Sequence, residues 1–202
     1  MSMGKVVVNR SMSLDGFTAG PGDAMDWIFD FMAPDEFPEI MAATGAMIIG
    51  RRTYEVAKRM ADQPGSGAYD GGPVFVLTHE PPDPPDPDIT FLSGDIGEAV
   101  ATALRAAGGK NLEILGADVA GQCLRRGLVD EIMVYVLPVL LGDGIPTGLR
   151  NSDCARNEPA CVGFGGSGWI AGLWPGDATI DCGSARWWAS SPDYGVAGLG
   201  SR

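Results

Sequence analysis

Residues 112–141 read LEILGADVAGQCLRRGLVDEIMVYVLPVLL, and this stretch decides the fold class. Leu112–Leu115 is a short apolar run typical of a buried strand, and Val119–Arg126 predicts a helix that is closed by Gly127. The β-branched run Glu131–Leu141 predicts a second strand. A strand, a helix and another strand in this order indicate one unit of a parallel sheet.

The same alternation runs through the preceding part of the chain. Strands are expected at Lys5–Ser11, Ala46–Ile49, Val74–Leu77 and Ile89–Leu92, and helices at Pro34–Ala43, Thr53–Ala61 and Ile96–Ala107. Asp95 and Glu98 have the spacing of a capping box at the start of the last helix. The pattern predicts an α/β fold with a mainly parallel central sheet and helices on both faces.

Composition is that of a soluble globular protein. The chain has 202 residues, of which 45% are hydrophobic and 20% charged, and its mean hydropathy is +0.06. The run Val134–Leu141 is interrupted by Pro138 and is far shorter than the roughly 18 to 20 residues of a membrane-spanning helix. Met1 leads into a predicted strand without a secretory leader, so we expect a cytoplasmic protein.

Charge and cysteine usage argue against several kinds of site. A net charge of −12 repels nucleic acid and anionic membranes, so an anionic ligand needs a local basic pocket. The four cysteines form no C-x-x-C pair and His79 is the only histidine, which argues against a zinc site. We expect no metal, no nucleic-acid partner and no membrane partner.

Three strand-to-helix junctions are candidates for binding a phosphorylated ligand, because helix N-termini at the carboxyl ends of strands present free N–H groups. In the first, Gly50 allows close backbone approach, Arg51 and Arg52 offer planar donors for phosphate, and Thr53 can cap or donate. The alternative is a solvated pair of arginines after an ordinary turn.

The second junction follows the predicted strand Val74–Leu77. Thr78 offers a hydroxyl and His79 an imidazole, and either could contact the phosphate or ribose of a nucleotide. Equally, a threonine and a histidine at a strand end are common loop residues.

The third junction is built from small residues. Gly116, Ala117, Asp118 and Val119 could hold a diphosphate against the N–H groups of a helix start. The carboxylate of Asp118 could instead cap the helix and occupy those donors itself. The sequence leaves both interpretations open.

Six segments resemble a known superfamily when they are taken in order. They are SLDGF at 13–17, GRRTYE at 50–55, VLTH at 76–79, LGAD at 115–118, GLVDE at 127–131 and LPVLLGDGIP at 137–146. Together they resemble the dihydrofolate-reductase-like superfamily, and most of all the reductase domain of riboflavin biosynthesis and its stand-alone relatives. Each motif is weak alone, but the set is specific and spans most of residues 1–146.

The resemblance implies a three-layer α/β/α domain over residues 1–146 that binds NADPH. It implies phosphate contacts from Gly50–Thr53, adenosine contacts from Thr78 and His79, and a diphosphate above Gly116–Val119. The nicotinamide would deliver a hydride, so the protein would orient the reactants, exclude water and place charge. Relatives of this kind commonly pair as homodimers.

The resemblance also implies that Ser13–Phe17 borders the nicotinamide and substrate, with Asp15 and Gly16 on the substrate side. Asp15 and Asp26 are the candidate catalytic carboxylates, although Asp15 is equally a turn residue before Gly16. Trp27 either forms a wall of the pocket or only packs.

Two departures from the superfamily stand out. Leu115 occupies a position where relatives often carry the first of two glycines. No residue clearly matches the helix carboxylate that grips the pterin in true dihydrofolate reductases; Asp35 and Glu36 are nearest and are also typical of a first helical turn.

The favoured activity is reduction of a small heterocyclic or sugar-derived substrate. Within this class, reduction of 5-amino-6-(5-phosphoribosylamino)uracil is the favoured reaction. Dihydrofolate reduction is the enzymatic alternative. A non-catalytic nucleotide-binding protein is the alternative from another class.

The pattern changes after Pro146. Residues 147–202 hold four of the five tryptophans and three of the four cysteines, without sustained strand or helix periodicity, so we expect an irregular tail. One hypothesis is a frameshift near Pro146, which would remove the two closing strands of the sheet and expose an edge; translating the gene in its other frames tests it. The alternative is a lineage-specific extension.

Overall fold

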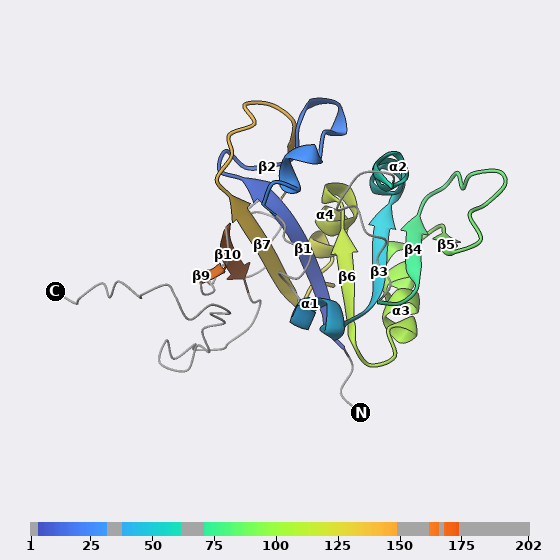
Figure 1. The fold of residues 1–202 in the computed structure, drawn as a ribbon. Helices are drawn as coiled ribbons and strands as arrows, with labels where there is room; N and C mark the ends of the chain where they lie inside the picture. Colours follow the sequence, from blue (N-terminus) through green and yellow to red (C-terminus); the bar gives the residue numbers. More distant parts are fainter. Residues whose placement is uncertain (1–3, 32–37, 62–70, 149–161, 166–167, 174–202) are drawn as a thin grey trace, which may run out of the picture.

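A central sheet organises the computed structural model, which describes residues 4–31, 38–61, 71–148, 162–165 and 168–173 (Figure 1). The strand order is β5-β4-β3-β6-β1-β7-β10-β9. The first six strands are mutually parallel: β1 (Val6–Ser13), β3 (Thr44–Gly50), β4 (Val74–Leu77), β5 (Ile89–Leu92), β6 (Asn111–Leu115) and β7 (Glu131–Leu137). The predicted α/β class is confirmed.

Helices connect these strands at the positions expected from the sequence. They are α1 (Pro38–Ala43), α2 (Arg51–Met60), α3 (Ile96–Ala106) and α4 (Ala117–Arg125), with short 3₁₀ turns η1 (Pro21–Asp23) and η2 (Asp26–Ile28). A small two-stranded sheet pairs β2 (Phe17–Ala19) with β8 (Ile145–Pro146). In the part of the chain that the structure describes, no helix has the length and apolar character needed to cross a bilayer.

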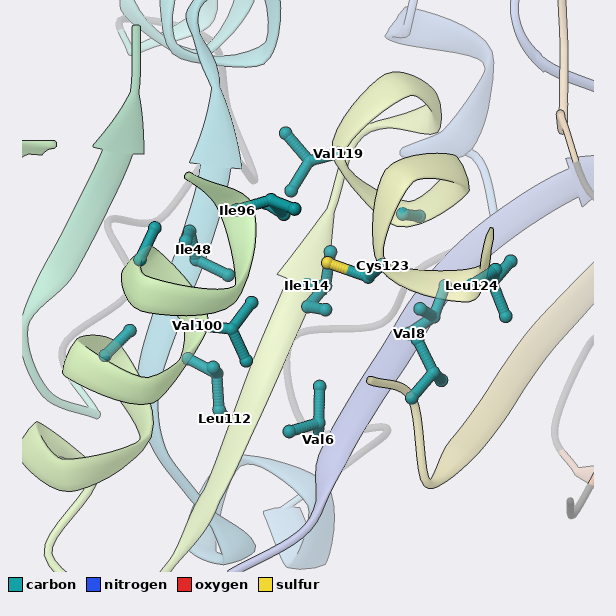
Figure 2. Close-up of a cluster of buried hydrophobic side chains, with 14 of the residues drawn as sticks. Val6, Val8, Ile48, Ile96, Val100, Leu112, Ile114, Val119, Cys123 and Leu124 are labelled. Atoms are coloured by element: carbon teal, nitrogen blue, oxygen red, sulfur yellow. The ribbon is translucent and has the colours of Figure 1, made fainter. Parts of the chain in front are cut away.

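The main core lies between the sheet and helices α3 and α4 (Figure 2). Side chains of a strand alternate between its faces, so Val6 and Val8 of β1 share the core-facing side. Val8, Leu112 and Ile114 are completely buried. Each such side chain contributes roughly 1.5–3 kcal/mol through removal of apolar surface from water.

The opposite face of β7 carries a second, smaller cluster. Ile28 of η2 packs there against Tyr135 and Leu137. The segment that contains η1 and η2 therefore covers the face away from α3 and α4.

The predicted helix cap at Asp95 is confirmed. Its Oδ1 accepts hydrogen bonds from the backbone N–H groups of Gly97 at 2.8 Å and Glu98 at 3.3 Å. These bonds satisfy two donors that the first turn of α3 leaves without helical partners.

Strand β7 ends earlier than the run Glu131–Leu141 predicts. It stops at Leu137, because Pro138 has no N–H to donate to the ladder. The chain then turns toward the end of β1, where the N–H of Leu14 donates to the carbonyl of Val139 at 2.8 Å.

The structure corrects the expectation of an irregular tail at two segments beyond residue 146. β9 (Val162–Gly165) and β10 (Gly168–Leu173) form an antiparallel hairpin, and β10 pairs with β7 from Trp169↔Val136 to Leu173↔Ile132. The β7 edge is thus covered rather than exposed. Frequent glycines dilute the apolar alternation in the sequence of both strands; backbone hydrogen bonds hold them, from β7 to β10 and from β10 to β9. The rest of the tail beyond Gly148 lies outside the described residues.

Candidate functional site

The three predicted junctions meet at one edge of the sheet. β6, β3 and β4 are parallel neighbours, with Ile49 opposite Leu115 and Gly50 opposite Leu77. Their arrowheads point to the same side of the molecule in Figure 1. The segments that follow these strands, Gly50–Thr53, Thr78–His79 and Gly116–Val119, therefore lie side by side.

Helix α4 begins without a side-chain cap. Its N-cap residue is Gly116, whose φ of +93° falls in a region that L side chains rarely adopt. The carboxylate of Asp118 accepts a hydrogen bond from the side chain of Gln122 at 2.7 Å, so the alternative in which Asp118 caps the helix is wrong. The N–H groups of the first turn, at Ala117, Asp118 and Val119, are available to an anion.

Helix α2 begins next to the start of α4 and also has a glycine as its N-cap residue. Gly50 is its N-cap, again without a side-chain cap. A Cβ added to Gly116 would lie 2.5 Å from Oγ1 of Thr53, and one added to Gly50 would lie 3.1 Å from Cγ2 of Val119. The two uncapped helix starts are therefore in close contact, and their positive dipole ends converge.

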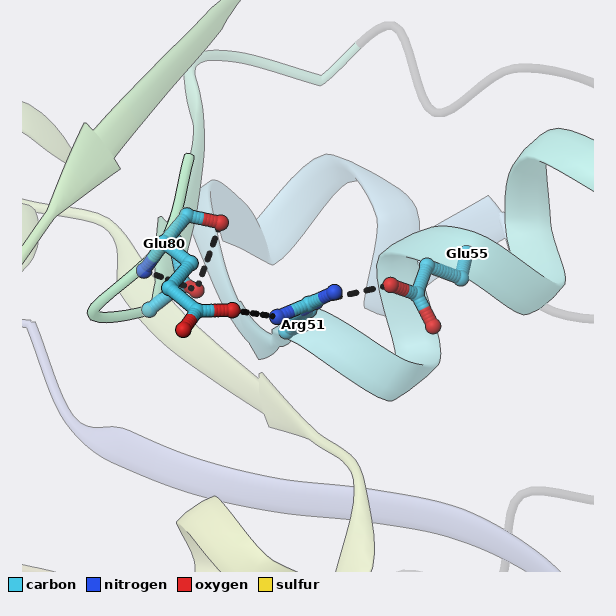
Figure 3. A network of polar contacts seen from close by, with 4 residues as sticks. Arg51, Glu55 and Glu80 are labelled. Carbon is cyan, nitrogen blue, oxygen red and sulfur yellow. Dashed lines mark hydrogen bonds and ion pairs between the residues drawn. The ribbon is translucent and has the colours of Figure 1, made fainter. Parts of the chain in front are cut away.

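Arg51 and Arg52 lie at the surface next to this contact and already have acidic partners. Arg51 donates through Nε to Glu55 at 2.8 Å and through Nη1 to Glu80 at 2.7 Å (Figure 3). Nη2 of Arg52 lies 2.6 Å from Oδ1 of Asp23. The two pairs of Arg51 are exposed and contribute about 0–1 kcal/mol each, so a phosphate could displace them, whereas the Asp23 carboxylate is largely buried.

The second junction is tied to the first through Glu80. The buried Thr78 accepts a hydrogen bond at its hydroxyl from the N–H of Glu80 at 3.1 Å, while the Glu80 carboxylate accepts from Arg51. His79 is exposed. The Thr78 hydroxyl therefore shapes the loop, and the imidazole of His79 is open to a ligand.

Asp15 anchors two loops. Its carboxylate accepts from the Ser13 hydroxyl at 2.6 Å and from the N–H groups of Leu141 at 3.1 Å and Gly142 at 2.7 Å. The Ser13 hydroxyl foremost, and then the Gly142 N–H, lower the pKa of Asp15 to about 2. Gly16 follows at a φ of +89° in the turn. This geometry makes Asp15 an anchor and gives no support to proton donation by it near neutral pH.

The other proposed substrate residues lie around η2. Asp26 is exposed at the start of this turn. Trp27 is half-buried against the cluster of Ile28, Tyr135 and Leu137, and its buried indole Nε1 has no hydrogen-bond partner in the described part of the chain. An unmet buried donor is uncommon in folded proteins, and a ligand that reached this N–H would satisfy it. Asp35 and Glu36 lie outside the described residues.

An open hollow of about 340 Å³ lies along α2 between Asp23, Tyr54 and Arg59. It shares Arg52 with the strand-end site but includes neither Gly50 nor Gly116. We place the candidate site at the strand ends, because uncapped helix starts and close glycine contacts converge there and not in the hollow.

Sequence reasoning missed Arg10, which occupies the middle of central strand β1. Arg10 is only 8% exposed, Nη1 donates to the carbonyl of Thr147, and Nε and Nη2 are buried without partners among the residues that the structure describes. The available signal was an arginine within the valine-rich strand that starts at Val6. Charged side chains are rarely buried in such a strand unless they serve a structural or ligand-binding role.

Sequence comparison gives a family and a bacterial relative. Residues 4–155 match the family model described as RibD C-terminal domain. The chain is also similar, with 28% identity over 145 residues, to the uncharacterized protein YwjB of Bacillus subtilis (strain 168). The matched region covers 70% of this chain and 81% of that protein.

Solved structures show the same fold. A putative riboflavin biosynthesis protein from Shewanella sp. PV-4 is similar with a TM-score of 0.66 and 23% identity, covering 84% of this chain and 98% of that one. A deaminase/5-amino-6-(5-phosphoribosylamino)uracil reductase from Thermotoga maritima gives a TM-score of 0.59 and 15% identity, covering 86% and 57%. Dihydrofolate reductase from Enterococcus faecalis, complexed with NADP(H), gives a TM-score of 0.55 and 15% identity, covering 85% of this chain and 95% of that one.

The sequence match and the architecture agree. The family model covers more than half of the chain, and it includes all three strand-end junctions. The mainly parallel sheet is that of dihydrofolate-reductase-like proteins. The chain belongs to the RibD C-terminal domain family.

Proposed function

We propose that this protein is an NADPH-dependent reductase that transfers a hydride to a small heterocyclic or sugar-derived substrate. The observation that carries the proposal is the contact between the uncapped starts of α2 and α4 at Gly50, Thr53 and Gly116. Convergent N–H groups, two glycines and neighbouring arginines suit a ligand with several phosphates.

The residues at this edge fit a nicotinamide dinucleotide. The N–H groups of Gly116–Val119 would hold the diphosphate, and the Thr53 hydroxyl lies beside them. Arg51 and Arg52 would pair with the additional phosphate that distinguishes NADPH from NADH. Thr78 and His79 would lie toward the adenosine. The bound nicotinamide supplies the hydride.

The chain's own residues would orient the reactants. Asp15 holds the turn after β1 against Leu141 and Gly142, which sets the position of the loop that borders the substrate. The free indole N–H of Trp27 can donate to a carbonyl or ring nitrogen of the substrate. An aminouracil offers such acceptors, which favours reduction of 5-amino-6-(5-phosphoribosylamino)uracil or a related compound.

Two measurements test the proposal. NADPH is titrated while its fluorescence is followed, and absorbance at the nicotinamide band is then monitored with the aminouracil ribotide and with dihydrofolate. We expect NADPH to bind and to be oxidised with the aminouracil ribotide. Oxidation of NADPH with dihydrofolate alone would indicate dihydrofolate as the substrate. Binding of NADPH without its oxidation by any candidate substrate would indicate a non-catalytic nucleotide-binding protein. If NADPH did not bind, the proposal would be overturned.

A further inference from the structure

One complete donor edge of Arg10 has no partner among the described residues. The Nη1 group donates to the carbonyl of Thr147, which leaves Nε and Nη2 unpaired. These two nitrogens form one side of the planar guanidinium, and their N–H bonds run nearly parallel. This is the geometry that binds two oxygens of a carboxylate or a phosphate at once.

The strand register places Arg10 beside the start of α4. Val8 of β1 lies opposite Ile114 of β6, so Arg10 is level with Gly116 two residues further along both strands. Alternation places its side chain on the same face as Val6 and Val8, which is the face that α4 covers (Figure 2).

The Thr147 contact locates the guanidinium more closely. Gly148, the residue after Thr147, passes the first residue of α4: a Cβ on Gly148 would lie 3.6 Å from both Cβ and the carbonyl oxygen of Ala117. The bond from Arg10 to the Thr147 carbonyl therefore holds the guanidinium between β1 and the segment that runs past the N-terminus of α4.

We propose that the Nε–Nη2 edge of Arg10 binds phosphate oxygens of the cofactor's diphosphate at the N-terminus of α4. The inference rests on the proposed function and adds to it a residue from the central strand. A phosphate at this edge would receive two parallel charge-assisted hydrogen bonds together with the free N–H groups of Ala117 and Asp118.

Charge favours this assignment. Burial lowers the pKa of Arg10 to about 10, so the guanidinium is still a cation at neutral pH. No carboxylate among the described residues pairs with it, whereas Arg51 and Arg52 both have acidic partners. A phosphate therefore reaches Arg10 without displacing another anion. Both free nitrogens are shielded from solvent, so a phosphate reaches them only when the surroundings of Arg10 rearrange.

The test compares three variants of the full chain. Arg10→Met removes the charge but fills the buried volume, Arg10→Lys keeps the charge without the paired edge, and Arg105→Met removes an exposed arginine from α3 as the matched control. Affinities for NADPH, inorganic pyrophosphate and ribose 5-phosphate are measured by fluorescence and calorimetry. Circular dichroism melts check that each variant is folded.

We expect Arg10→Met to weaken both NADPH and pyrophosphate by about tenfold or more, because one bidentate phosphate contact is lost. Arg10→Lys should be intermediate and Arg105→Met unchanged. Equal affinities of wild type and Arg10→Met for NADPH and pyrophosphate would overturn the inference. A loss of affinity confined to ribose 5-phosphate would also overturn it, because it would place Arg10 at the substrate. Wild type that binds neither pyrophosphate nor NADPH would overturn it too.

Two further outcomes separate this inference from the proposed function. Wild type that binds pyrophosphate through Arg10 but does not oxidise NADPH would support the phosphate site and contradict the reductase. Should Arg10→Met not fold, the wild-type Arg10 Nε–H resonance decides. It should shift on addition of pyrophosphate, and an unchanged resonance at saturation would overturn the inference.

Discussion

The hydroxyl oxygen of Thr53 lies 2.5 Å from the position that a Cβ on Gly116 would take. Helices α2 and α4 therefore start against each other with no room for a side chain at residue 116. Substitution Gly116→Ala would push Thr53 away and would also strain a backbone with a φ of +93°. We expect NADPH affinity to fall by about tenfold or more, measured by fluorescence titration, since the phosphate-binding N–H groups move.

Gly127→Ala is the matched control for this change. Gly127 also has a positive φ, of +65°, but a Cβ there would meet no atom within 4 Å. Both variants should lose about 1–2 kcal/mol of unfolding free energy from backbone strain, while only Gly116→Ala should lose cofactor affinity. Unchanged NADPH binding in Gly116→Ala would argue against the proposed diphosphate position.

Arg51 and Glu80 should affect cofactor choice in opposite directions. Arg51→Ala removes a phosphate donor and should weaken NADPH more than NADH, by about tenfold in their ratio. Glu80→Gln frees Nη1 of Arg51 from its carboxylate partner, so NADPH should bind up to about fivefold more tightly. The dissociation constants of both dinucleotides are measured for each variant. An equal loss of NADH and NADPH affinity in Arg51→Ala would speak against its role at the extra phosphate.

Asp15 should make the protein sensitive to acid. Its folded pKa of about 2 lies below the ordinary value of 3.8, so its stabilising contribution is complete above about pH 4 and is lost as the pH falls toward 2. Ser13→Ala removes the hydrogen bond that contributes most to the lowered pKa, and the pKa of Asp15 should rise toward 3.8. A carboxyl carbon NMR titration of wild type and Ser13→Ala measures this. An Asp15 pKa that Ser13→Ala leaves unchanged would refute the anchoring role of the hydroxyl.

Glu113 should destabilise the fold near neutral pH. The side chain is buried in central strand β6, accepts a hydrogen bond from Thr44, and has a pKa that burial raises. Its contribution is therefore most favourable in acid and declines as the pH rises through the folded pKa. Glu113→Gln keeps the size and an acceptor oxygen but removes the charge, and it should add about 1–2 kcal/mol of unfolding free energy at pH 7. Urea unfolding of wild type and Glu113→Gln at pH 4 and pH 7 tests this. We expect the variant to have the higher unfolding free energy at pH 7 and the same value as wild type at pH 4.

The sequence predicted the elements that depend on local chemistry. Apolar periodicity located the six parallel strands, and the Asp95 side chain signalled the start of α3, because both features involve residues close together in the chain. The strand-end position of Gly50 and Gly116 also followed from local pattern. Their contact with each other did not, since it depends on which strands are neighbours in the sheet.

The features that the sequence did not reveal depend on distant partners. Asp15 was proposed for the substrate side, but its carboxylate binds N–H groups of Leu141 and Gly142, more than 120 residues away in the chain. Burial of Arg10 likewise depends on Thr147 and on the helix that covers β1. Strand β10 was missed because the edge of β7 stabilises it through backbone hydrogen bonds rather than through a side-chain pattern.

Hydrogen–deuterium exchange of the full chain with and without NADPH tests the central claim most directly, because it reports both binding and its location without a known substrate. We predict slower exchange in peptides that contain Arg51–Thr53 and Gly116–Val119, and unchanged exchange at the end of α3 near Arg105. Exchange that NADPH leaves unchanged throughout, or protection confined to segments away from these two helix starts, would contradict the account.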